Sequence, residues 1–137
     1  MKLFLVALIF VSSIAPAQVP EKIPVYLGSS CEGNSTGSIV ESSFRESVRA
    51  SSGYRLVDQK EAGVFTVSLA CVDAGQPSEG WSAIAYMFGL VMKPTPEGVG
   101  GLSIWRPSMG VFTTGAAHAQ NKGQELFARF DNELHHH

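Results

Sequence analysis

Two cysteines, Cys31 and Cys71, are the strongest constraint on how this chain can fold. In an oxidising compartment, an even number of cysteines is expected to be paired. In the chain-entropy model, closing a loop of about 40 residues stabilises a fold by roughly 4 kcal/mol, against a total of about 5–15 kcal/mol for a small domain. A fold that contains this bond has to bring residues 31 and 71 side by side.

Residues 1–17 predict export to such a compartment. Lys2 precedes an unbroken apolar run from Leu3 to Val11, and small residues follow, with Ala15 and Ala17 at the two positions that a signal peptidase reads. The run is shorter than the roughly 20 residues of a membrane span, which favours a cleavable signal peptide over an uncleaved anchor or a buried core strand. We therefore expect cleavage after Ala17, a periplasmic or secreted location, and no membrane insertion of the mature chain.

The rest of the chain has the length and composition of one globular domain, residues 18–134. Residues 135–137 are three histidines that resemble the remnant of a purification tag. Because Lys2 leaves with the signal peptide, nine Lys and Arg remain against twelve Asp and Glu, a net charge of −3. The basic residues are scattered, so the sequence provides no electrostatic basis for binding nucleic acid or an anionic membrane.

Apolar alternation and turn residues divide the domain into five strands and two helices, an α/β fold that borders on α+β. Ser38 and Glu41 form a capping-box pattern at the start of the first helix, and Gly53 ends that helix. Gly123 costs the second helix about 1 kcal/mol relative to Ala, which predicts a close backbone contact there. The expected strands are residues 23–28, 54–58, 64–73, 81–92 and 102–106, and the second helix is expected over residues 114–134.

This order of elements predicts a mixed sheet of about five strands, with a βαβ unit followed by an antiparallel meander. The first strand would run parallel to the strand over residues 64–73. Cys31 and Cys71 would then both lie at the carboxyl ends of neighbouring parallel strands. The expected disulfide and the expected topology therefore support each other.

Bulky apolar residues gather in the second half of the domain, on both faces of the strand over residues 81–92. Two helices can cover one face of a five-stranded sheet, so the other face would form an interface unless loops or the helices also cover it. We expect the partner to be an envelope or extracellular protein or a second copy of the chain, with the loop from Lys93 to Gly101 as a further docking element. The candidate interface residues are Trp81, Met87, Val91 and Trp105.

Residues 28–37 have the glycine spacing of a phosphate-binding loop between a strand and a helix. Asn34 stands where that motif needs Lys, and Glu32 would repel an anion, so nucleotide binding is not expected. Two interpretations remain, a tight loop that holds the disulfide and a site for a small anion or polar ligand. The candidate ligand residues are Ser29, Ser30, Asn34 and Ser35.

The sequence carries no enzyme signature. His118 is the only histidine before residues 135–137, and neither a nucleophile nor an orienting carboxylate accompanies it at motif spacing. No catalytic, cofactor-binding or metal-binding residue is assigned. The sequence predicts an exported, non-catalytic interaction or accessory module of the cell envelope, and the alternative is a polar-ligand binding protein or weak hydrolase that uses the Gly28–Gly37 loop.

Overall fold

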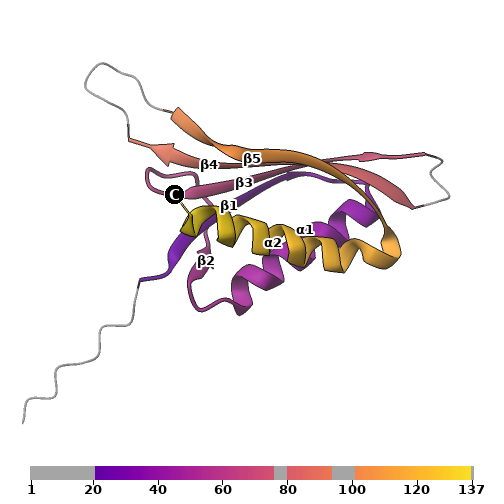
Figure 1. Ribbon diagram of the computed structural model, residues 1–137, viewed down its shortest axis with the longest axis horizontal. Coiled ribbons are helices and arrows are strands. Elements are labelled where there is room, and N and C mark those ends of the chain that lie inside the picture. Colours follow the sequence, from indigo (N-terminus) through magenta and orange to yellow (C-terminus); the bar gives the residue numbers. More distant parts are fainter. Residues whose placement is uncertain (1–20, 76–79, 94–100, 137) are drawn as a thin grey trace, which may run out of the picture.

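The computed structural model describes residues 21–75, 80–93 and 101–136, of which residues 101–108 are described by their backbone alone. Within these ranges the chain forms a five-stranded mixed sheet, in the order β2-β1-β3-β4-β5, and two α-helices (Figure 1). The predicted signal peptide and residues 94–100 of the proposed docking loop lie outside the described residues. The elements are β1 (Ile23–Ser30), α1 (Ser35–Ala50), β2 (Tyr54–Leu56), β3 (Phe65–Asp73), β4 (Trp81–Met92), β5 (Gly101–Gly115), a 3₁₀ turn (Ala116–His118) and α2 (Ala119–His135).

The sheet has the predicted topology. β1 pairs in parallel with both β2 and β3, and β3, β4 and β5 pair antiparallel. Ser30 at the end of β1 lies opposite Ala70 of β3, so the next residue of each strand brings Cys31 beside Cys71. The two sulfur atoms are bonded and the Cα atoms are 4.8 Å apart, which confirms the predicted disulfide.

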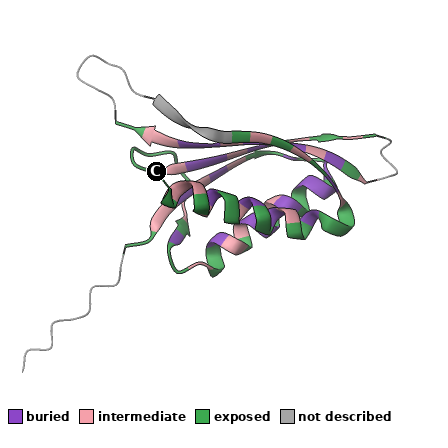
Figure 2. Ribbon diagram, in the orientation of Figure 1, coloured by how far each residue is buried: buried purple, intermediate pink, exposed green. Residues whose placement is uncertain are grey.

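Both helices pack against the same face of the sheet (Figure 1), and their buried residues face it (Figure 2). The core lies between these two layers. The ring of Phe130 on α2 contacts Phe44 of α1 and Phe88 of β4 edge to face, with ring centroids 6.2 Å and 5.3 Å apart. The largest fully buried apolar side chains of the core are Val25, Val40, Phe44, Val48, Val67, Ile84, Phe88 and Phe130.

The first helix begins earlier than the capping-box pattern predicted. α1 starts at Ser35, and its N-cap is Asn34, whose side-chain oxygen accepts a hydrogen bond from the backbone N–H of Gly37 at 2.7 Å. Glu41 does not return to the helix start. Its carboxylate accepts hydrogen bonds from Ser29 at 2.7 Å and from Arg45 at 3.0 Å. The capping-box prediction was wrong because the amide side chain of Asn34, four residues upstream of Ser38, caps the helix instead.

The last strand is longer than predicted. A strand over residues 102–106 and a helix from Thr114 were expected, whereas β5 continues to Gly115. Thr113 and Thr114 are both β-branched, which favours a strand. Pro107 lies in an irregular stretch of the β4–β5 register, where its missing N–H removes no hydrogen bond from the ladder. The second half of β5 therefore belongs to the sheet.

Candidate interaction surface

The candidate surface is the side of the sheet that faces away from both helices. Side chains alternate along β3 and β4, so Leu69 and Tyr86 point into the core while Ala70 and Ala85 are exposed on the other side. We call this side the open face. Its described residues are Tyr26, Gly28 and Ser30 of β1, Thr66, Ser68, Ala70 and Val72 of β3, Trp81, Ala83, Ala85, Met87, Gly89 and Val91 of β4, and Met109, Val111 and Thr113 of β5. Thr66 and Gly89 are buried, and Lys60 lies over the ring of Tyr26.

The open face is apolar. Val111 is 71% exposed, and Met109 and Val72 are each 62% exposed. A shallow groove of about 560 Å³ crosses the face between Ser30 and Val111, and none of the residues that line it carries a charge. Because a charge-free and apolar surface loses little by desolvation, contiguous patches of this kind usually mark interfaces.

The four predicted interface residues have different positions. Trp81 is half exposed at the start of β4, on the same side as Met87, and Met87 lines the groove. Val91 is partly exposed near the other end of β4. The side chain of Trp105 lies outside the described residues.

Sequence reasoning missed the β5 half of the open face. Met109 and Val111 alternate with Phe112, which packs against the core from the opposite side. This alternation is visible in the sequence, but the predicted strand ended at residue 106 and the predicted helix began at residue 114, so the stretch between them was assigned to neither. A longer predicted strand would have found both residues.

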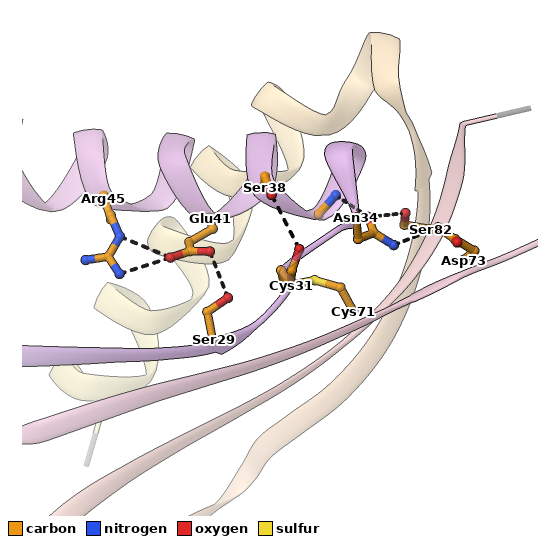
Figure 3. The surroundings of a disulfide bond; sticks show 10 residues. Ser29, Cys31, Asn34, Ser38, Glu41, Arg45, Cys71, Asp73 and Ser82 are labelled. Atoms are coloured by element: carbon orange, nitrogen blue, oxygen red, sulfur yellow. Dashed lines mark hydrogen bonds and ion pairs between the residues drawn. A yellow bond between two sulfur atoms is a disulfide. The ribbon is translucent and has the colours of Figure 1, made fainter. Parts of the chain in front are cut away.

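A hydrogen-bonded cluster next to the disulfide joins α1 to the strands that carry the open face (Figure 3). We call this cluster, which consists of Asn34, Gly37, Asp73 and Ser82, the clamp. The oxygen of the buried Asn34 side chain accepts a hydrogen bond from the Ser82 hydroxyl at 2.6 Å, in addition to the one from Gly37, and its amide nitrogen donates to Asp73 at 3.0 Å. A Cβ on Gly37 would lie 2.5 Å from the sulfur of Cys71, so only glycine fits there. The start of α1 is thus tied to the end of β3 and the start of β4.

The four candidate ligand residues do not converge on one point. The Ser29 hydroxyl donates to Glu41, and the Asn34 side chain is buried in the clamp. Ser30 borders the groove of the open face, and Ser35 is exposed at the first turn of α1. These contacts give no support to the polar-ligand interpretation of the Gly28–Gly37 loop, which stays a prediction.

A second groove, of about 450 Å³, lies between β5 and α2. Arg129 donates a hydrogen bond to the hydroxyl of Tyr86, and its guanidinium carbon is 5.7 Å from the centroid of that ring. Lys122 forms an ion pair with Glu125 at 3.1 Å. Both cationic side chains therefore already have a partner in the folded chain.

Two of the described titratable side chains, those of His118 and Tyr54, differ in their surroundings. His118 is exposed in the 3₁₀ turn, and no group of three or more His, Cys, Asp or Glu side chains in these ranges could hold a metal ion. Burial raises the pKa of Tyr54 above its ordinary value, and the hydrogen bond to Asp131 and the charge of that carboxylate raise it further. Tyr54 donates this bond at 2.5 Å and joins β2 to α2, which is a structural role.

Among the described residues, no helix is long and apolar enough to cross a membrane. No protein-family model matches the sequence. None of the curated proteins is significantly similar to it. Two solved structures are similar to the chain at 17% sequence identity, both dodecamers of PelC from Paraburkholderia phytofirmans, one of them a variant. The similarity covers 77% of this chain and 85% and 83% of theirs, with TM-scores of 0.42 for the variant and 0.41 for the other.

Proposed function

We propose that this chain is an exported, non-catalytic interaction module of the cell envelope that binds a protein through its open face. The observation that carries the proposal is that the two faces of the sheet differ. One face is covered by both helices and forms the core, whereas the other presents exposed apolar side chains around a charge-free groove.

The energetics favour a protein partner. Complete burial of one Val or Met side chain stabilises a complex by about 1.5–3 kcal/mol. Val111 and Met109 both start from more than half exposed, so they can contribute most of that amount. No charged side chain in the groove has to lose its hydration shell when a partner binds.

The disulfide supports a location outside the cytoplasm. Bonds such as the one between Cys31 and Cys71 persist in oxidising compartments and are rare where thiols are kept reduced. Together with the signal peptide expected at residues 1–17, this bond favours a periplasmic or secreted protein.

Site-specific photo-crosslinking in the producing cell tests the proposal. A photoreactive residue in place of Ala85 lies at the centre of the open face, and one in place of Ala128 lies on the exposed side of α2. We expect protein adducts from position 85 and not from position 128. Equal adducts from both positions, or none from position 85, would contradict the proposal.

A further inference from the structure

We propose that the protein partner contributes an extended segment that pairs with the edge of β5 and adds a strand to the sheet. This segment would carry an acidic residue between two apolar residues. The inference rests on the proposed function, because it names the part of the partner that binds beside the open face. Three observations lead to it: the direction of the β5 backbone groups, the uncharged stretch from Met109 to Gly115, and the position of Arg129.

The backbone of β5 is paired on one side only. β5 is the last strand of the sheet, and within the described ranges no strand lies along its other side. The N–H of Ala74 donates to the carbonyl of Trp81 at 2.8 Å, so Trp81 and every second residue after it in β4 bond toward β3. The residues between them bond toward β5. By the same alternation, three residues of β5 direct their N–H and C=O groups away from β4: Met109, Val111 and Thr113.

The second half of β5 lacks the features that usually protect a strand edge. Proteins protect such edges with a charged residue, a proline or a bulge. In β5 the irregular stretch of the register and Pro107 both precede Met109. The stretch from Met109 to Gly115 has neither a charge nor a proline, and it stays in register with β4. At the opposite edge of the sheet, β2 spans only Tyr54–Leu56, so β5 offers the longer edge.

An extended peptide fits this edge, because its own N–H and C=O groups repeat at the same interval. The side chains of an added strand would alternate between the two grooves that border β5. One row would lie on the open face beside Met109 and Val111, which line its groove. The other row would lie beside Gly110 and Phe112, in the groove between β5 and α2. Pairing with β5 would therefore join the two grooves into one binding surface.

The groove between β5 and α2 favours an acidic side chain next to Gly110. A Cβ on Gly110 would lie 2.6 Å from the ring carbon of Tyr86 that bears the hydroxyl, so the glycine leaves room for this hydroxyl near the edge. Arg129 donates a hydrogen bond to the same hydroxyl, which places its guanidinium group beside Gly110. A guanidinium has five N–H donors, and Arg129 forms no ion pair within the described ranges. A carboxylate on the added strand would pair with it without displacing another carboxylate.

Charge also distinguishes this partner from a second copy of the chain. Two β5 edges in antiparallel pairing would place both α2 helices on the same side of the extended sheet, each with Lys122 and Arg129 beside the new contact. Lys122 is paired with Glu125 at 3.1 Å, which leaves one net positive charge on each helix flank. A second copy would therefore meet a like charge, whereas an acidic segment meets an opposite one.

Peptide selection followed by fluorescence anisotropy tests the inference. Heptapeptides are selected on the exported chain from a random phage-displayed library, and enriched peptides are synthesised with a fluorophore. We expect an acidic residue between apolar residues. Methylation of the peptide N–H groups at one set of alternate residues should weaken binding by about tenfold or more, and methylation at the other set should have little effect. Equal effects of the two sets, or the absence of any enriched peptide, overturn the inference.

V111P and V111A separate backbone pairing from side-chain contact. V111P removes an N–H that points to the unpaired edge and leaves the hydrogen bonds to β4 in place. It should weaken peptide binding by about thirtyfold or more, because the proline ring also blocks the approach of the added strand. V111A keeps the N–H and should weaken binding by about fivefold or less. Equal affinities of the two variants overturn the inference.

R129Q tests the acidic residue of the segment. This variant should weaken binding of the selected acidic peptides by about two- to fivefold at low salt, and by less at high salt. R49Q is the matched control, because Arg49 is an exposed arginine on α1 that pairs with Glu46, and its binding should be unchanged. Urea unfolding midpoints show whether each variant is folded. Full affinity of R129Q overturns the acidic assignment.

Photo-crosslinking from position 85 separates this inference from the proposed function. Protein adducts that disappear in V111P and persist in V111A support both. Adducts that persist in V111P would leave the proposed function standing and overturn the inference. If the unaltered chain gives no adduct, the proposed function fails, whereas peptides with the expected methylation pattern would still support strand addition at β5.

Discussion

Replacing Gly123 with Ala should destabilise the fold, although Ala is the better helix former. Gly123 lies inside α2 where this helix crosses α1. A Cβ at this position would lie 2.6 Å from the backbone oxygen of Val40 and 2.5 Å from the Cβ of Ser43. Backbone atoms cannot rotate away, so the two helices have to separate by about 0.8 Å to reach the ordinary contact distance of 3.4 Å.

The size of the effect follows from two opposing contributions. Ala in place of Gly stabilises a helix by about 1 kcal/mol, whereas overpacking a well-packed contact costs about 1–3 kcal/mol. Separation of the helices also stretches the hydrogen bond from the Ser43 hydroxyl to the Gln120 carbonyl, now 2.6 Å long, which is worth about 1 kcal/mol. We therefore expect G123A to lower the free energy of unfolding by about 1–3 kcal/mol.

Urea denaturation followed by circular dichroism measures this change. G53A is the matched control, because a Cβ at Gly53 would meet only the Ser51 hydroxyl at 3.8 Å. Gly53 does not have a positive φ, so this variant should be neutral or more stable by up to about 1 kcal/mol. A G123A chain as stable as the unaltered chain, or more stable, would refute the close helix contact.

Two further predictions concern the disulfide and a buried tyrosine. The C31A/C71A double variant should lose up to about 4 kcal/mol of unfolding free energy in urea, because the bond closes a 40-residue loop in the unfolded chain. A loss below about 1 kcal/mol would contradict this explanation. Y54F should lose about 1–2 kcal/mol at pH 7, because it removes the hydrogen bond to Asp131. Above pH 10 the folded chain keeps the Tyr54 proton, whereas the unfolded chain releases it. The contribution of Tyr54 to the free energy of unfolding is therefore complete below about pH 10 and is lost as the pH rises. The unfolding free energy of Y54F should therefore fall less steeply above pH 10 than that of the unaltered chain, and equal slopes would contradict the raised pKa of Tyr54.

The order of the elements, the parallel pairing of β1 with β3, and the disulfide could all be predicted from the sequence. These features depend on local patterns, such as the alternation from Phe65 to Cys71, and on the short list of topologies that join such elements. The close contact at Gly123 was also visible, because a glycine inside an amphipathic helix is costly unless another backbone approaches it.

Only the tertiary structure decided where the first helix begins and how far β5 extends. Asn34 caps α1 because Ser82 and Asp73 also bind its side chain, and these residues are distant in sequence. Met109 and Val111 join Ala70 on one exposed surface because β5 pairs with β4 beyond the irregular stretch at Pro107. A sequence pattern shows which side chains share a face of one strand, but which faces remain uncovered depends on how all the strands and helices pack.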